Sequence, residues 1–403
     1  MNNMDQKKQT PQVRFKGFTD AWEQRKLGEI FVEYSEKNHE ELPALMIVQG
    51  AGTIIRDESD RNLMYDKANL SNYKLVREKD FIVHLRSFEG GLEMAKNTGI
   101  ISPAYHTLHG KGTDSRFNYS YFRSKKFIDC DLKPHVYGIR DGRSIDIGGM
   151  KTIQIPYTNF AEQKAIGDYI EKLDNLITIH QRKYTKLFNL KKAMLEKMFP
   201  QNGCLYPEIR FKGFTDAWEQ RKLSELAEKT YGGGTPATSN EVFWNGNIPW
   251  IQSSDVVDGK LFGVEPRKHI TQEGLNNSAT QLVPQNSIAI ITRVGVGKLA
   301  FMPFSYTTSQ DFLSLSKLNT EPFFTVYACY KKLQSELNAV QGTSIKGITK
   351  DELLAKIIMV PEYAEQQQIG AFFRNIDNLI TLHQRKLEKL KQIKKSCLEK
   401  MFV

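Results

Sequence analysis

The stretch RFKGFTDAWEQRKL stands at residues 14–27 and again, without a single difference, at residues 210–223. A second matched pair, built on AEQ, IG, DNLIT, HQRK and LEKMF, occupies residues 161–199 and 364–402. Two long copies in the same order indicate a tandem duplication. We call residues 14–27 and 210–223 the first and second frame segments, and place the rest of the chain relative to them.

The composition predicts an ordinary folded protein. The chain has 403 residues, of which 40% are hydrophobic and 25% charged, which suggests two or three domains. It has no apolar run long enough to span a membrane, and its polar start lacks the apolar core of a secretory signal. We therefore expect a cytoplasmic protein that has no membrane partner.

The charge is unevenly distributed along the chain. The net charge of +10 is compatible with a nucleic-acid partner and excludes an acidic mimic of DNA. Residues 161–199 carry 8 Lys and Arg against 5 Asp and Glu, and residues 364–402 carry 8 against 4. The segments 28–158 and 224–361 are neutral by count. If they bind DNA, they must use locally placed residues, with base contacts for specificity and a few phosphate contacts for register.

The sequence divides into six parts. They are a flexible tail (1–13), a first globular domain (14–158), a first helical spacer (159–200), a connector (201–209), a second globular domain (210–361) and a second helical spacer (362–403). The two frame segments match, whereas the rest of the two globular domains does not. This contrast predicts two different recognition heads on one repeated frame.

The first globular domain has runs rich in strand-forming residues at 44–48, 80–85 and 150–156, bounded by turn residues. This pattern predicts a small α/β domain with a twisted sheet. Polar and basic side chains suited to base edges and phosphates lie between the strands. For each of them the alternative is a solvated loop charge. The candidate DNA-binding residues of this domain are Arg86, Ser87, Lys111, Arg116, Tyr137, Arg140 and Arg143.

The second globular domain is marked by YGGGTP at 231–236, WNGNIPW at 244–250, TRVGVGK at 292–298 and QGTSIKGITKDEL at 341–353. Glycine lets the backbone approach a ligand closely, and Arg, Lys, Ser and Thr donate hydrogen bonds to DNA. The candidate DNA-binding residues here are Gly233, Gly234, Thr235, Ser253, Ser254, Arg293, Lys298, Ser344 and Lys346.

A long helix is predicted for each spacer. Large or apolar residues recur in alternating four-three spacing from Ile166 to Met198, and again from Ile369 to Met401, as in a coiled-coil seam. Each helix of 39 residues, from 161 to 199 and from 364 to 402, would be about 58 Å long at 1.5 Å per residue. Because a single seam is unstable in water, we expect the two helices to pair with each other.

Known catalytic motifs are missing. The stretch GVGK at 295–298 is no phosphate-binding loop, because Thr292 stands where its first glycine is required and Leu299 where a Ser or Thr is required. There is no GxSxG, no HExxH and no cluster of Cys and His at metal-ligand spacing. We therefore expect neither a catalytic residue nor a metal site in this chain.

Some repeated residues suggest a surface that is used twice. The two helices match at Asp174 and Asp377, Asn175 and Asn378, Gln181 and Gln384, and Arg182 and Arg385, positions that should face solvent. The frame aromatics either fix each half onto its helix or contact a partner. The candidate subunit-docking residues are Phe15, Trp22, Arg182, Phe211, Trp218 and Arg385.

In this order and with this duplication, the motifs closely resemble the specificity subunit of type I restriction-modification enzymes. The resemblance covers essentially the whole chain: the repeated frame, GGTP at 233–236, WNGNIPW at 244–250, and the AEQ helix starts. The first domain departs from the pattern, since it has neither a GGTP start nor an IPW element.

The resemblance implies an α+β protein with two α/β target recognition domains joined by two long antiparallel coiled-coil helices in pseudo-two-fold symmetry. Such a subunit reads double-stranded DNA, one half-site per domain, and has no chemistry of its own. Two methyltransferase subunits and two ATP-dependent restriction subunits would dock on it, and they would bring S-adenosylmethionine, ATP and Mg. The alternatives are a coiled-coil scaffold that holds two protein-binding domains and a self-sufficient enzyme, which the missing motifs disfavour.

Overall fold

The computed structural model describes residues 10–58, 67–83, 92–137, 144–201, 203–339 and 347–403. The chain forms two compact units. The first unit comprises Met1–Gln181 and Arg385–Val403, and the second comprises Arg182–Gln384. Each unit therefore contains one globular domain, the beginning of the helix that follows it and the end of the other long helix.

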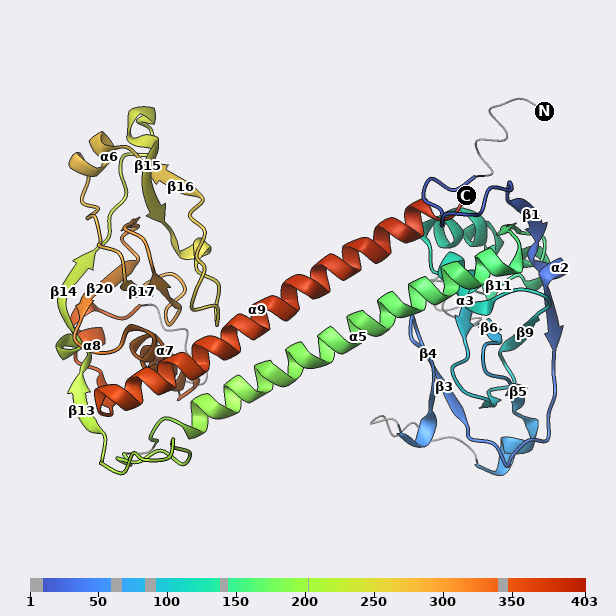
Figure 1. The fold of residues 1–403 in the computed structure, drawn as a ribbon, viewed down its shortest axis with the longest axis horizontal. Coiled ribbons are helices and arrows are strands. Elements are labelled where there is room, and N and C mark those ends of the chain that lie inside the picture. The colour runs from blue at the N-terminus through green and yellow to red at the C-terminus, as the bar shows by residue number, and fades with distance from the viewer. Residues whose placement is uncertain (1–9, 59–66, 84–91, 138–143, 202, 340–346) are drawn as a thin grey trace. The chain divides into compact units, whose positions relative to one another are not determined.

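The two long helices are α5 (Phe160–Lys197) and α9 (Tyr363–Lys400), shown in green and red in Figure 1. Each has 38 residues, so the predicted bounds are confirmed to within about two residues. Ile166, Ile170 and Leu173 of the predicted seam are buried, as is Ile369 at the start of the second seam. At the seam position predicted for residues 190 or 191, Lys191 is buried and Leu190 is exposed.

Within each unit the two helices run in opposite directions. In the first unit Asp174 accepts a hydrogen bond from Lys394 at 2.6 Å. In the second unit Asp377 accepts one from Lys191, also at 2.6 Å. These are the same two sequence positions in both copies. The prediction that these acids face solvent is wrong for Asp377, which is 18% exposed, whereas Asp174 is 48% exposed and binds the other helix as well.

Each frame segment ends in a strand that pairs with the strand before the long helix. Strands β1 (Glu23–Lys26) and β12 (Gln154–Tyr157) pair antiparallel in the first unit. Strands β13 (Glu219–Lys222) and β21 (Ile357–Val360) do so in the second unit, in the equivalent register. The strand predicted at 150–156 is only partly correct. Its first residue ends helix α4 (Ile147–Met150), and the strand itself begins at Gln154.

The start of each long helix is bound to its frame segment. Glu162 accepts two hydrogen bonds from Arg14, at 2.6 and 2.8 Å, and Glu365 accepts two from Arg210, at 2.8 and 2.7 Å. Both carboxylates are buried. Paired charge-assisted bonds of this kind are strong and geometrically specific. The repeated Arg and Glu therefore join the frame segment to the helix.

Each globular domain has its own central sheet, and the two sheets have the same strand order although the sequences of the domains differ. The first unit has a four-stranded sheet in the order β2-β9-β6-β7, and the second has one in the order β14-β20-β17-β18. The strands are β2 (Phe31–Tyr34), β6 (Phe81–Val83), β7 (Leu92–Met94), β9 (His106–Gly110), β14 (Ala227–Gly232), β17 (Ser287–Ile291), β18 (Leu299–Met302) and β20 (Phe312–Leu318). In chain order they occupy the same places, so the expectation of two unlike heads holds only outside this sheet.

A helix follows the last strand of each sheet in chain order and packs on the long helix. These are α3 (Ser115–Phe122) and α7 (Pro322–Ala339). Phe117 of α3 contacts Trp22, and Phe324 of α7 contacts Trp218, with ring centroids 5.5 and 5.9 Å apart. All four rings are buried, so each frame tryptophan is part of a core.

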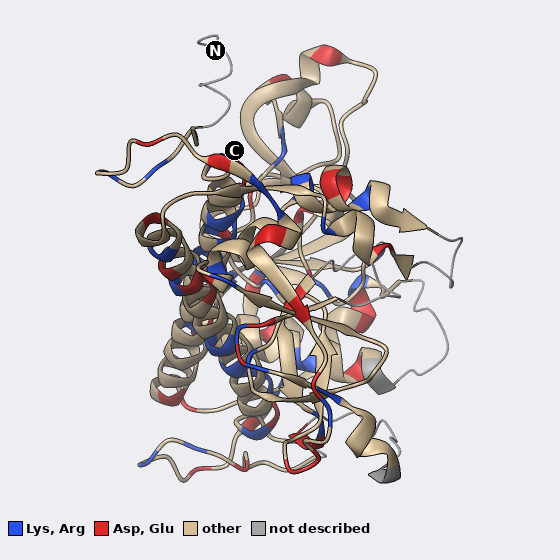
Figure 2. Cartoon of the chain, turned by 90° about the vertical axis from the view of Figure 1, so that its right-hand side faces the viewer, with Lys and Arg blue, Asp and Glu red and all other residues tan. Residues whose placement is uncertain are grey.

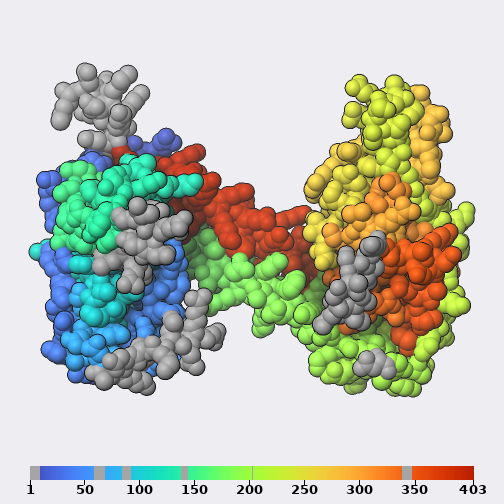
Figure 3. All heavy atoms as spheres, turned by 180° about the vertical axis from the view of Figure 1, so that it is seen from behind, coloured from blue at the N-terminus to red at the C-terminus, as the bar shows by residue number. Residues whose placement is uncertain are grey.

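The remaining elements differ between the units. The first has α2 (Leu27–Ile30), β3 (Leu45–Val48), β4 (Gly52–Ile55), β5 (Lys74–Val76), β8 (Gly99–Ile101), a π-helix (Lys126–Leu132), β10 (Val136–Tyr137) and β11 (Ser144–Ile145). The second has β15 (Trp244–Ile251), β16 (Lys268–Ile270), α6 (Gln272–Asn276), β19 (Thr307–Thr308) and α8 (Lys350–Leu354). Part of β15, with β16 and α6, forms a lobe that stands clear of the body of the second unit, in yellow in Figure 3.

Candidate nucleic-acid interface

Most of the predicted DNA-binding segments of the second unit meet at one end of its sheet. The amide of Gly234 donates to the carbonyl of Thr308 at 2.8 Å, and the amide of Ser309 donates to Ile251 at 2.9 Å. The amide of Thr292 then donates to Asp311 at 2.8 Å. The ends of β14, β15 and β17 and the start of β20 are thereby joined. This strand end carries Thr235, Ser253, Ser254, Arg293 and Lys298.

The two glycines of GGTP have a structural role. A Cβ on Gly233 would overlap the carbonyl of Ser309, and one on Gly234 would overlap the amide of Thr280. The carbonyl of Gly234 accepts the indole N–H of Trp250 at 3.0 Å. Glycine is thus required for close backbone contact inside the protein, whereas we expected it to admit DNA. The exposed member of the motif is Thr235, which donates to Gln310 at 2.7 Å.

The connection between β17 and β18 is a tight turn with an exposed tip. Gly295 and Gly297 have φ of 92° and 88°, a conformation that favours glycine. Arg293 is exposed, and Val294 is 71% exposed although it is apolar. A guanidinium and an apolar side chain at one tip can contact a guanine edge and a thymine methyl group.

The second unit's other predicted residues lie just after β15 or outside the described residues. Ser253 and Ser254 belong to a short 3-10 helix that Gln252 and Asp255 cap. Ser344 and Lys346 lie outside the described residues. The segment after them returns to the same place, because the amide of Ile348 donates to Thr292 at 2.7 Å.

In the first unit most candidates cannot be placed. Arg86, Ser87, Arg140 and Arg143 lie outside the described residues. Tyr137 is described and is 60% exposed, and it pairs with Ser144 where β10 and β11 are joined to residues 138–143. Lys111 is exposed just after β9. Arg86 and Ser87 connect β6 to β7, as Arg293 and Lys298 connect β17 to β18, so the two sets occupy equivalent connections.

Arg116 is a correction to the predicted DNA contacts. Its guanidinium donates to Asp114 at 2.7 Å, to Asp168 at 2.5 Å and to Glu171 at 2.9 Å. These hydrogen bonds, of which the one to Asp114 has the largest effect, raise the pKa of Arg116 above its usual value. The charge is satisfied inside the protein, where it fixes α3 against α5, so it is not available to a phosphate.

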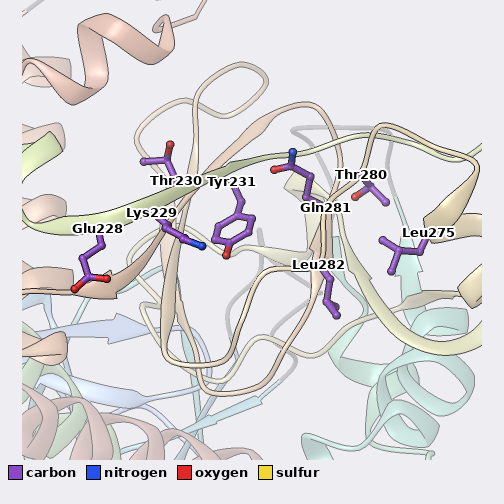
Figure 4. A pocket seen from close by; sticks show the side chains of 8 residues that line it. All are labelled: Glu228, Lys229, Thr230, Tyr231, Leu275, Thr280, Gln281 and Leu282. Carbon is purple, nitrogen blue, oxygen red and sulfur yellow. The ribbon is translucent and has the colours of Figure 1, made fainter.

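An open pocket of about 670 Å³ lies along the outer edge of β14 (Figure 4). Lys229 and Tyr231 of the strand extend into it, and Thr280, Gln281 and Leu282 line it from the segment beside the GGTP turn. The sequence reasoning missed these residues. The alternation of Lys229 and Tyr231 along a strand was the available signal, since it places both on one face.

The docking candidates divide into buried and exposed residues. Trp22 and Trp218 are 1% and 2% exposed, so they are wrong as docking contacts and serve as core residues. Phe15 and Phe211 are half-buried against Tyr169 and Phe372 of the helix starts. The remaining candidates, Arg182 and Arg385, are exposed.

An apolar pair that we did not predict is exposed at the same positions of both helices. Leu176 and Ile179 of α5 are 43% and 46% exposed, and Leu379 and Leu382 of α9 are 43% and 45% exposed. Residues three apart lie on one face of a helix. Figure 2 shows Lys and Arg along both helices with Asp and Glu among them.

The described part of the chain has neither a metal-binding cluster nor a helix that could span a membrane. No group of three or more His, Cys, Asp or Glu in those residues could hold a metal ion. Among the described helices, none is long and apolar enough to cross a membrane.

Comparisons with known proteins identify the family. The family model described as type I restriction modification DNA specificity domain matches residues 19–189 and again residues 215–392. The EcoR124I/EcoR124II specificity subunit of Escherichia coli is 27% identical over 330 residues, which cover 76% of this chain and 79% of that protein. The MjaVIII specificity subunit of Methanocaldococcus jannaschii is 23% identical over 404 residues, covering 93% and 91%.

A solved structure has the same fold. The type I restriction-modification S subunit from M. genitalium aligns with a TM-score of 0.59 at 16% identity, over 98% of this chain and 99% of that chain. Two matched domains in one chain argue for a DNA reader over a scaffold of protein-binding domains. The chain belongs to the type I restriction-modification DNA specificity family and is a specificity subunit with two such domains.

Proposed function

We propose that each unit reads one half of a bipartite DNA target through the loops at the end of its central sheet, and that the chain has no catalytic chemistry of its own. The observation that carries this proposal is that the central sheets of the two units have the same strand order. In each unit two strands that are consecutive in the chain pair antiparallel, β6 with β7 and β17 with β18, and the residues between them in the sequence, 84–91 and 292–298, are different. A constant framework with variable tips is suited to reading two different half-sites.

In the second unit Arg293 would contact a base edge or a phosphate, and Val294 a thymine methyl group. Thr235 and Gln310 lie at the same strand end and offer a hydroxyl and an amide. Lys298, Ser253 and Ser254 would position the backbone of the duplex. In the first unit Tyr137 and Lys111 are the exposed candidates, and the segments around Arg86 and Arg140 would complete the reader.

Partner subunits would dock on the repeated helix surface. The matched exposed residues are Leu176, Ile179 and Arg182 on α5 and Leu379, Leu382 and Arg385 on α9. A surface that occurs twice is suited to two copies of one partner, which would be methyltransferase subunits that bind S-adenosylmethionine. Two restriction subunits that use ATP and Mg would join them. The equivalent contacts of the two units support a pseudo-two-fold body with an antiparallel coiled coil.

The test compares Arg293→Ala with a matched control, Lys317→Ala, in the chain assembled with its methyltransferase subunits. Lys317 is an exposed cation near the opposite end of β20. Arg293→Ala should weaken binding of the cognate duplex, by about 1–3 kcal/mol if the arginine reads guanine. Sequencing of methylated bases should show relaxed selection in one half-site only. Equal affinity and an unchanged methylated sequence would show that the hairpin tip does not read DNA.

A further inference from the structure

The junction between each recognition domain and its own long helix has the same geometry in both units. The amide of Asp114 donates to Gln163 and that of Glu321 donates to Gln366, each at 2.9 Å. Asp114 caps the start of α3 through the amide of Phe117, and Glu321 binds the amide of Phe324 near the start of α7. The two short helices therefore meet α5 and α9 in the same way.

A glycine on each long helix lets a residue of the short helix, Arg116 of α3 or Phe323 of α7, lie close to the long helix. A Cβ on Gly167 would lie 3.2 Å from the Cβ of Arg116, and one on Gly370 would lie 3.1 Å from the Cβ of Phe323. Arg116 and Phe323 thus occupy the same place at the two junctions. Their chemistry is different, so the facing residues of α5 and α9 must differ as well.

The first junction is ionic. Arg116 binds Asp168 at 2.5 Å and Glu171 at 2.9 Å, both on α5, in addition to Asp114 on its own side. The arginine side chain is only 18% exposed, so its charge depends on these partners. Removal of the partners of a largely buried charge is strongly destabilising.

The second junction is aromatic. The positions of Asp168 and Glu171 in the second copy hold Ala371 and Arg374. The guanidinium of Arg374 lies 3.9 Å from the ring centroid of Phe323 and 5.5 Å from that of Phe262. A guanidinium over an aromatic face is an attractive arrangement. The cation of the junction is therefore on the recognition domain in the first unit and on the long helix in the second.

We propose that these two junctions match each recognition domain to its own helix, so that the domains are not interchangeable within this chain. After an exchange, Arg116 would face Arg374, a like charge. Phe323 and Glu321 would face Asp168 and Glu171, which brings three carboxylates together without a cation. This selectivity concerns how the chain is built, so it stands or falls separately from the reading of DNA by the loops.

The experiment exchanges residues 28–160 with residues 224–363 in the full chain, with both cuts inside or beside the repeated segments. A second variant adds Asp168→Ala, Glu171→Arg, Ala371→Asp and Arg374→Glu, which moves the helix residues together with their domains. We expect the first variant to unfold at a lower urea concentration than the parent chain, and the second to recover at least half of that loss. An exchanged chain as stable as the parent, or four substitutions that recover nothing, would overturn the proposal.

A local transplant keeps the question answerable if the exchanged chain does not fold. Arg116→Phe is compared with Asp168→Ala/Glu171→Arg and with all three changes together in the otherwise unchanged chain. Coupled groups should make the triple variant more stable than the separate effects predict, by at least about threefold in the folding equilibrium constant. Lys172→Asn is the control, because Lys172 is exposed and the second copy has Asn375 there. Additive effects at Arg116 would count against the proposal.

Discussion

At the scale of single residues, identical letters in the two copies do not have identical surroundings. Glu162 accepts hydrogen bonds from Trp22 at 3.1 Å and from Thr158 at 2.6 Å, besides those from Arg14. The equivalent indole N–H of Trp218 has no hydrogen-bond partner among the residues that the structure describes. The frame of the first unit is therefore more completely hydrogen-bonded at this point.

This difference predicts unequal effects of one substitution. Glu162→Ala and Glu365→Ala should each cost about 3–5 kcal/mol, because each leaves a mostly buried arginine unpaired. The loss at Glu162 should be larger by about 1–2 kcal/mol, since the hydrogen bonds of Trp22 and Thr158 are lost too. Urea unfolding followed by probes in each unit measures both. Equal losses would mean that the extra hydrogen bonds contribute nothing.

Glu321 predicts a pH effect on stability. Burial raises the pKa of its carboxyl above the usual 4.5, against the smaller opposing effects of the amides of Phe324 and Phe323 and the charge of Arg374. The folded state then keeps a proton that the unfolded state has lost. Stability from this group is complete below pH 4.5 and falls as the pH rises through the raised pKa.

Glu321→Gln keeps an acceptor for the amide of Phe324 but removes the titration. The variant should lose less stability than the parent chain between about pH 4.5 and neutral pH. Glu196→Gln, at an exposed position of α5, is the control and should leave the pH profile unchanged. Parallel profiles of the Glu321 variant and the parent would refute a raised pKa.

At the scale of elements, the long helices are joined by two equivalent ion pairs with different burial. Lys191 is 9% exposed and Asp377 18%, whereas Lys394 is 30% exposed and Asp174 48%. Asp377 also accepts a hydrogen bond from Tyr327 at 2.6 Å, and Lys191 lies 5.5 Å from the ring centroid of that tyrosine. The pair in the second unit is thus part of a buried network.

Removing the acid should reveal this difference. Asp377→Ala leaves a buried ammonium and a buried hydroxyl unpaired, and we expect a loss of about 3–5 kcal/mol. Asp174→Ala should cost about 1 kcal/mol or less, because water reaches both partners. Lys191→Met should be tolerated better than Asp377→Ala, since its aliphatic chain still fills the space. Thermal unfolding of the three variants ranks their losses of stability. An equal loss for Asp377→Ala and Asp174→Ala would contradict the conclusion that only the second unit's ion pair is part of a buried network.

At the scale of the whole molecule, each unit is completed by the last residues of the long helix that begins in the other unit. Phe402, just after α9, packs in the first unit, with its ring centroid 6.1 Å from that of Trp22 and 5.2 Å from that of Phe117. Phe199, just after α5, packs in the second unit, 5.9 Å from Trp218 and 5.8 Å from Phe324. The repeated LEKMF endings therefore contribute their phenylalanine rings to cores.

Truncation of these rings should destabilise the unit that they contact. Phe402→Ala should speed hydrogen exchange in α3 and leave α7 unchanged, although residue 402 follows the second domain in sequence. Phe199→Ala should do the reverse and cost about 3 kcal/mol, as expected for a buried phenylalanine. Faster exchange in α7 after Phe402→Ala would show that the ends pack elsewhere.

The sequence by itself determined the duplication, both long helices, the frame segments and the family. These follow from letters that recur at a fixed spacing and from a hydrophobic period of a helix, both of which are local properties. Only the tertiary structure decided the common central sheet, because strands of different sequence can pair in one order when backbone hydrogen bonds carry the pairing. It also decided the roles of Arg116, Trp22, Gly233 and Asp174, since a side chain's partner across a fold depends on burial and distance, which the order of the residues does not state.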